Sequence, residues 1–182
     1  TRLLLTPGPT PVPPEILRAM ARPLFHHRTP EYQKLFREVT LGLQRIFKTR
    51  HPVYIFAASG TGAMEAALVN FHSPGDSILV VDGGKFGERF WWIAQAYGLI
   101  VQILKVRYGE AVSPEEIEQA LEKNPNLQSV CLQLCETSTG AVYDLKEISR
   151  RLRGKKPLLI VDAISGLAAD PFQARAVARL YE

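Results

Sequence analysis

The chain has 182 residues, of which 46% are hydrophobic and 22% are charged, as in ordinary globular proteins. Its 22 basic and 18 acidic residues are dispersed, and the densest basic cluster, residues 150–156, contains no aromatic side chain. That composition favours a solvated helix end over a nucleic-acid-binding patch. No apolar run approaches the roughly 18 residues of a membrane helix. The start lacks a full signal-peptide core, and Cys131 and Cys135 lie in one apolar segment, so we expect a cytoplasmic protein without disulfides.

Helical segments and short apolar runs alternate along the chain. After an N-terminal arm with a short helix (residues 1–28), Thr29 and Pro30 are typical of a helix start, and apolar residues then recur three or four apart as far as Phe47. Strands are predicted at 53–57, 78–81, 100–106, 130–134 and 157–161, and further helices at 63–71, 86–97, 114–123, 145–152 and 173–182. The alternation predicts an α/β fold with a mostly parallel sheet flanked by helices.

Three polar segments follow predicted strands, where ligands bind in open parallel sheets. The glycine-rich turn at 59–62 opens a helix and either holds a phosphate or is purely structural, since its spacing fits neither the Walker nor the dinucleotide motif. The hydroxyl-rich segment 136–140 either binds a ligand or caps its own loop. Asp162 ends the last strand, where a carboxylate either caps the next turn or pairs with a cationic ligand group.

Taken together, these motifs resemble the class V branch of the fold-type-I pyridoxal-5′-phosphate (PLP) enzymes, and most closely the alanine-glyoxylate and serine-pyruvate aminotransferases. The resemblance is carried by Leu5–Thr10, Ser59–Leu68, Pro74–Asp76, Gly84–Arg89, Glu136–Gly140 and Val161–Ser165. It implies that residues 29–172 are part of a PLP-binding large domain and that 173–182 form a tail outside the similarity.

The resemblance also implies which residues hold the cofactor. Ser59, Gly60 and Thr61 match the turn that grips the phosphate of PLP. Phe86 matches an aromatic residue that stacks on the pyridine ring, and Ile164 matches the aliphatic residue on the opposite ring face.

Two residues match positions that take part in catalysis. Thr137 corresponds to a hydroxyl residue near the ring oxygen and the imine, and Asp162 to the carboxylate that pairs with the ring nitrogen and keeps it protonated. Gly8 lies in the N-terminal loop that approaches the substrate in the family. We expect no metal ion, because the two cysteines lack a second Cys/His pair.

One element of the family pattern is missing. The enzymes attach PLP to a lysine that follows the aspartate strand by one further strand, whereas all eight lysines here precede Asp162, the last being Lys156. Lys85, beside Phe86, does not match that position. Two explanations stay open: the 182 residues are an incomplete record of a longer chain, which the loss of resemblance in mid-domain favours, or they are a natural or cloned fragment. We expect the chain to be inactive alone.

The parent reaction implied by the resemblance transfers an amino group from a small amino acid, alanine or serine, to a 2-oxo acid, glyoxylate or pyruvate, in a homodimer. A cysteine desulfurase-like class V enzyme is one alternative. The other is a non-catalytic binding or assembly module that retains the fold.

Overall fold

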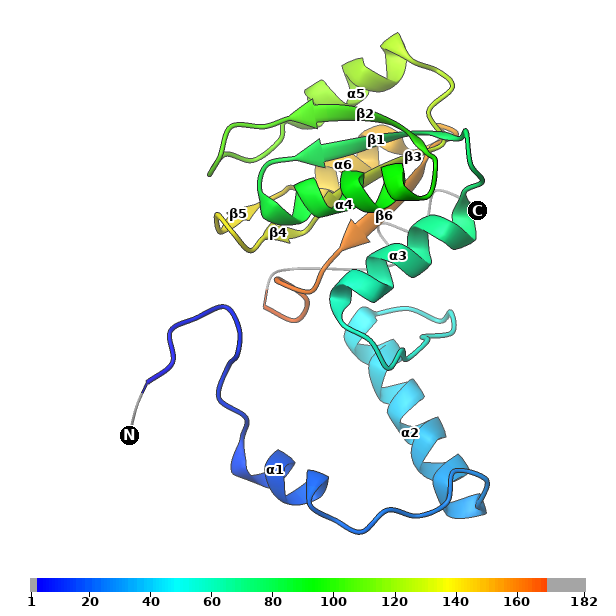
Figure 1. The fold of residues 1–182 in the computed structure, drawn as a ribbon, viewed down its shortest axis with the longest axis vertical. Coiled ribbons are helices and arrows are strands. Elements are labelled where there is room, and N and C mark those ends of the chain that lie inside the picture. The colour runs from blue at the N-terminus through cyan, green and yellow to red at the C-terminus, as the bar shows by residue number, and fades with distance from the viewer. Residues whose placement is uncertain (1–2, 170–182) are drawn as a thin grey trace.

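Four parallel strands form the centre of the computed structural model, which describes residues 3–169 (Figure 1). They lie in the order β2-β1-β3-β6. The strands are β1 (Ser77–Asp82), β2 (Ile100–Lys105), β3 (Ser129–Gln133) and β6 (Leu158–Asp162). A two-stranded antiparallel ribbon of β4 (Cys135–Glu136) and β5 (Ala141–Val142) follows β3. The predicted α/β fold with a parallel sheet is confirmed.

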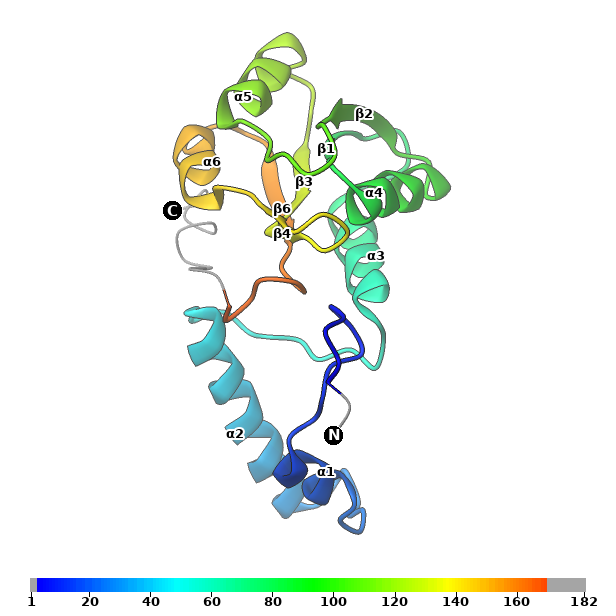
Figure 2. The same cartoon turned by 90° about the vertical axis from the view of Figure 1, so that its left-hand side faces the viewer.

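Six helices accompany the strands in the described part of the chain. They are α1 (Pro14–Met20), α2 (Pro30–Phe47), α3 (Gly60–Phe71), α4 (Lys85–Ala96), α5 (Pro114–Lys123) and α6 (Leu145–Leu152). Helices α3 and α4 cover one face of the sheet, and α5 and α6 cover the other (Figure 2).

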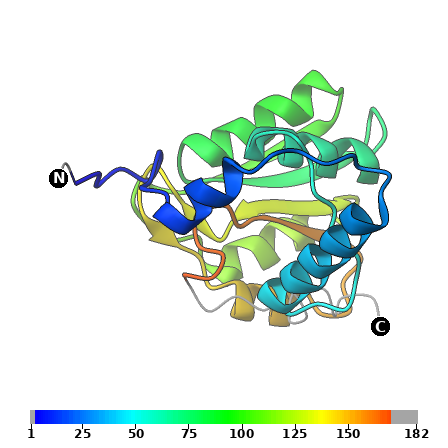
Figure 3. The same cartoon turned by 90° about the horizontal axis from the view of Figure 1, so that it is seen from below.

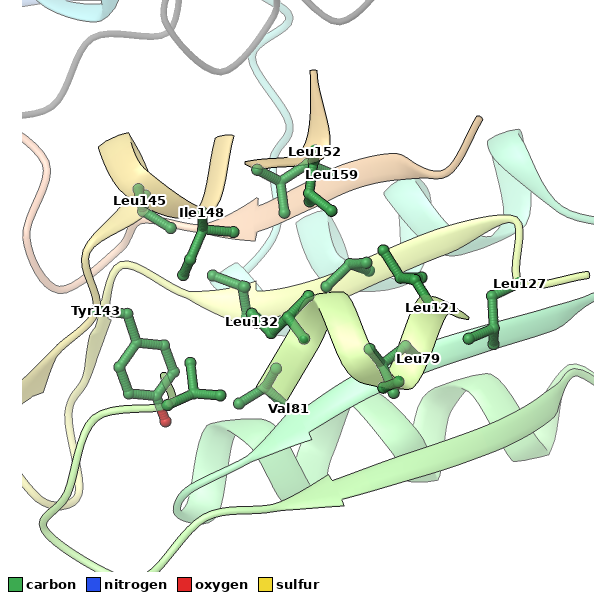
Figure 4. Packing of buried hydrophobic residues seen from close by; sticks show 14 of the residues in the cluster. Leu79, Val81, Leu121, Leu127, Leu132, Tyr143, Leu145, Ile148, Leu152 and Leu159 are labelled. Atoms are coloured by element: carbon green, nitrogen blue, oxygen red, sulfur yellow. The ribbon is translucent and has the colours of Figure 1, made fainter. Parts of the chain in front are cut away.

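Alternate residues of each strand supply the two hydrophobic cores. On β1, Leu79 and Val81 pack toward α5 and α6, whereas Ile78 and Val80 pack toward α3 and α4. Figure 4 shows the first of these cores, in which Leu132 of β3 lies among side chains of α5, α6 and the neighbouring strands. Because both faces are covered, the strands read as continuous apolar runs in the sequence.

Local capping signals set the predicted helix starts. The Thr29 hydroxyl accepts a hydrogen bond from the Tyr32 amide at 3.3 Å, at the start of α2. Ser113 and Glu116 form a reciprocal capping box at the start of α5. The predicted bounds of α2, α5 and α6 are confirmed.

The predicted strand at 53–57 is wrong. The segment is extended but pairs with no strand among the described residues, and Tyr54, Ile55 and Phe56 are exposed. An apolar pattern in the sequence does not show whether a neighbouring strand will form backbone hydrogen bonds with the segment. The following helix starts at Gly60 rather than at 63, so both glycines of the predicted turn, Gly60 and Gly62, belong to the helix itself.

The N-terminal part extends away from one end of the sheet (Figure 1), and α1 and α2 are nearest the viewer in Figure 3, which shows the molecule from that end. Neither α1 nor α2 contains a buried residue, although α2 is amphipathic, and the apolar side chains of Leu35, Phe36 and Val39 are exposed. No helix within residues 3–169 is long and apolar enough to cross a bilayer. The helix predicted at 173–182 lies outside the described residues.

We expect Leu132→Ala to lower the free energy of unfolding by about 2–5 kcal/mol, because Leu132 is fully buried and its truncation leaves a cavity between sheet and helices. Urea unfolding of the chain measures the change. Leu24→Ala is the matched control, since that side chain is 99% exposed. Equal loss of stability in both variants would contradict the described core.

Candidate functional site

Polar residues end three neighbouring strands on the face covered by α3 and α4. Gln133 of β3 is paired in register with Asp162 of β6, and these two residues share the sheet face of Cys131 and Ile160. Asp82 ends β1 on the same face, where it accepts hydrogen bonds from Trp91 Nε1 at 2.9 Å and Lys105 Nζ at 2.5 Å. The carboxyl edge of the sheet is therefore polar on this face.

The N-terminus of α3 lies beside this edge and is open. Ser59 is its N-cap, and its side chain makes no capping hydrogen bond. Within residues 3–169, no acceptor bonds the backbone amides of Gly60 and Thr61. These amides and the positive end of the helix dipole together favour an anion.

The loop after β6 contacts this helix start. A Cβ atom on Gly60 would overlap Cδ1 of Ile164, so the Ile164 side chain lies directly against the start of α3. An open cavity of about 350 Å³ lies at this junction, and Gly60, Asp162, Ile164 and Phe90 are among its lining residues. The structure thus brings together Gly60, Asp162 and Ile164, which the sequence predicted to share a cofactor site.

Asp162 is half-buried at the end of β6. Its Oδ1 accepts a hydrogen bond from the Ile164 amide at 3.0 Å. Burial raises the pKa of the Asp162 carboxyl above its ordinary value, while the Ile164 amide and the Arg89 guanidinium act in the opposite direction. A cation placed against Asp162 would favour the ionised carboxylate.

Glu136 closes the N-terminus of α4, in contrast to the open start of α3. Its side chain is fully buried, and Oε2 accepts hydrogen bonds from the amides of Phe86 and Gly87, both at 3.1 Å. Oε1 accepts from the Ser138 hydroxyl at 2.6 Å, and that hydroxyl oxygen accepts from the Lys85 amide at 3.0 Å. The first three amides of α4 therefore all have partners in the segment after β3.

Gly84 makes this arrangement sterically possible. A Cβ atom on Gly84 would lie 2.6 Å from Cγ of Glu136 and would also overlap the Ser138 hydroxyl. The buried carboxylate can therefore reach the amides only past a glycine.

The predicted residues Phe86 and Thr137 are carried by the two segments that Glu136 joins. Phe86 is half-buried in the first turn of α4, and the Thr137 hydroxyl lies 2.5 Å from the Ser165 hydroxyl in the loop after β6. Thr137 is thus linked to the loop that carries Ile164.

Gly8 is not brought into this group. It lies in the exposed N-terminal arm, and no heavy atom beyond its chain neighbours lies within 4 Å of a Cβ placed there. Lys85 is also directed elsewhere, since its Nζ pairs with Glu88 at 2.7 Å.

Sequence reasoning missed Glu136, Gln133, Arg89 and Ser165 as members of the site. The Gln133 side chain is fully buried beside Asp162, and neither its Nε2 nor its Oε1 has a hydrogen-bond partner in the described part of the chain. Motif matching could have flagged Glu136 and Arg89, because both lie inside the quoted motifs. No local signal marks Gln133, whose position depends on strand register.

The cysteines do not form a metal or redox pair. Cys131 is buried in β3, where burial raises the pKa of its thiol to about 12, and Cys135 lies in β4. Neither cysteine forms a disulfide within the described residues, and the two lie in different strands, β3 and β4. Among residues 3–169, no three His, Cys, Asp or Glu side chains are grouped so as to hold a metal ion.

We expect Glu136→Gln to lower the free energy of unfolding by about 1–3 kcal/mol, because one oxygen that accepts hydrogen bonds becomes an NH₂ group facing other donors. Thermal and urea unfolding measure the change. Glu116→Gln is the matched control, since glutamine also serves in a capping box and that residue is exposed. A Glu136→Gln variant as stable as this control would refute the anchoring role of Glu136.

Comparison with known proteins places this geometry in a family. A family model described as aminotransferase class-V matches residues 2–178. The soluble hydrogenase 42 kDa subunit of Anabaena cylindrica is 41% identical over 170 residues, which is 92% of this chain and 44% of that protein. The serine–glyoxylate aminotransferase of Methylorubrum extorquens is 32% identical over 176 residues, which is 94% of this chain and 44% of that protein.

A solved structure gives the same result for the fold. The alanine–glyoxylate aminotransferase from Nostoc sp. superposes with a TM-score of 0.91 at 35% identity, covering 96% of this chain and 46% of that one. The chain thus spans less than half the length of these proteins. Its sequence and its fold both show that it belongs to the class-V aminotransferase family.

Proposed function

We propose that this chain forms the cofactor-holding part of a PLP-dependent aminotransferase that moves an amino group from alanine or serine to glyoxylate or pyruvate. The observation that carries the proposal is the meeting of an open helix N-terminus with a half-buried carboxylate at one cavity. The substrate class is supported by the relatives compared above, which include a serine–glyoxylate and an alanine–glyoxylate aminotransferase.

The residues present fit PLP. The unpartnered amides of Gly60 and Thr61, with Ser59, suit a phosphate group. Asp162 has a raised pKa and pairs with no cation in the described part of the chain, so a protonated ring nitrogen would supply the missing charge. Phe86 and Ile164 offer the aromatic and aliphatic surfaces that a planar ring requires.

PLP supplies an electron sink for the substrate carbon once its ring nitrogen is protonated. Asp162 keeps that proton on the nitrogen by its negative charge. Phe86 and Ile164 hold the ring plane so that the bond to be broken stands perpendicular to it. Thr137, held by Ser165, offers a hydroxyl near the ring oxygen, and the α3 amides fix the phosphate end.

No observation favours the alternatives. A desulfurase needs a mobile, ionisable thiol, whereas the Cys131 thiol is fully buried with its pKa raised to about 12, and Cys135 is part of the β4–β5 ribbon. A pure assembly module would have no reason to leave two helix amides without acceptors near a carboxylate that has no cationic partner among the described residues.

We expect the full-length protein to transfer amino groups between alanine or serine and glyoxylate, and Asp162→Asn to lower kcat by about 10²- to 10³-fold, because the amide cannot hold the ring nitrogen in its protonated form. Steady-state assays with each donor measure this. Asp144→Asn, which alters the N-cap of α6, is the control, since asparagine caps equally well.

A full-length protein without transaminase turnover would contradict this function. Turnover by the 182-residue chain that is lost on Asp162→Ala would instead contradict the expectation that this chain is inactive alone, which rests on the lack of a lysine after Lys156.

We also propose a homodimer in the cytoplasm. The amphipathic helix α2 has no buried residue, and an exposed apolar face of this kind is typical of a surface covered by a partner. A second copy is the partner that the family resemblance implies. The lack of a disulfide between the two cysteines in the described part of the chain fits a reducing compartment.

We expect Val39→Asp to convert the full-length dimer to a monomer, because it places a charge in the centre of the apolar face of α2. Sedimentation equilibrium measures the mass. Lys34→Asp, which changes the charge on the opposite face of the same helix, should leave the dimer intact. A wild-type monomer, or a Val39→Asp dimer of unchanged affinity, would contradict the assignment of this face.

A further inference from the structure

Arg89 contacts residues in the first turns of both α3 and α4. It lies in α4, and its Nη1 donates a hydrogen bond to the Thr61 hydroxyl at 2.9 Å, at the start of α3. Its guanidinium carbon lies 4.9 Å from the centroid of the Phe86 ring. Burial raises the pKa of the Asp162 carboxyl, and the charge of the same guanidinium opposes that rise.

Arg89 forms no ion pair in the described part of the chain. No carboxylate there lies within ion-pair distance of its half-buried guanidinium. Two lysines at this edge of the sheet differ in this respect, because Lys85 pairs with Glu88 and Lys105 pairs with Asp82. A partly buried cation whose only acceptor is a neutral hydroxyl is poorly compensated.

The position of the Arg89 guanidinium adds to this excess of positive charge. Thr61 is the second residue of α3, so the guanidinium lies at the positive end of the helix dipole and beside amides that have no partner. Two positive features repel each other unless an anion lies between them. The N-terminus of α4 shows the compensated case, since the Glu136 carboxylate occupies it.

We propose that Arg89 supplies the positive charge that neutralises the cofactor phosphate, and that it thereby makes the site select PLP over unphosphorylated pyridoxal. This inference rests on the proposed function, because it assigns a residue to the phosphate end of the same cofactor site. Arginine suits the role, since its planar group can keep the Thr61 hydrogen bond and still present donors to a phosphate.

The ratio of two affinities tests the assignment. The full-length protein, freed of cofactor, is titrated with PLP and with pyridoxal and followed by absorbance. In Arg89→Gln we expect the affinity for PLP to fall about 10- to 100-fold, while that for pyridoxal stays within about threefold of wild type. Arg89→Lys keeps the charge and should restore most of the ratio.

The controls separate this inference from the proposed function. Arg107→Gln removes an exposed arginine paired with Glu110 and should leave both affinities unchanged. Equal weakening of both ligands in Arg89→Gln would mean that Arg89 acts through Phe86 or the fold, and would overturn the inference. Unchanged affinities would overturn it as well. If Arg89→Gln does not fold, the ratio of the two affinities is measured in the wild type and in Arg89→Lys at low and at high salt. A preference for PLP that does not fall as the salt concentration rises then overturns the inference, because salt screens an attraction between charges. A wild-type protein that binds neither ligand contradicts the proposed function itself.

Discussion

The buried carboxylate of Glu136 links the two segments on which the proposed cofactor site depends. A fully buried carboxylate is tolerated only when its oxygens are hydrogen-bonded, and here the donors come from α4 and from Ser138. Neither segment can move without leaving that charge unsatisfied. The positions of Phe86 and Thr137 are thus fixed by an interaction to which neither side chain contributes.

The parallel sheet explains why residues distant in the sequence meet at one cavity. Parallel strands place their carboxyl ends at one edge, so the loops after β1, β3 and β6 gather there, and α3 presents its start to the same edge. A residue at the end of β6 and a residue at the start of α3 then share a cavity although about 100 positions separate them in the chain. In the proposed cofactor site, the start of α3 would therefore hold the phosphate and the end of β6 would face the ring.

The sequence predicted best what local interactions decide. Helix starts at Thr29 and Ser113 follow from capping within one turn, and the bounds of α2, α5 and α6 agree with them. Buried strands stand out because both faces are covered. The segment at 53–57 has the same apolar character without a ladder partner, which no local pattern reveals. The sequence analysis did not identify Glu136, Arg89 or Gln133 for a similar reason. Their roles arise from contacts with residues of other helices and strands.

In the proposed site, charge would set the direction of the bound cofactor. The α3 amides and Arg89 contribute positive charge at the proposed phosphate end, and the Asp162 carboxylate contributes negative charge at the end of β6. A ligand with an anionic group at one end and a cationic ring nitrogen at the other is favoured in one direction and repelled in the reverse direction. Phe86 and Ile164 carry no charge, so their part in the proposed site would be to fix the plane of the ring rather than its direction.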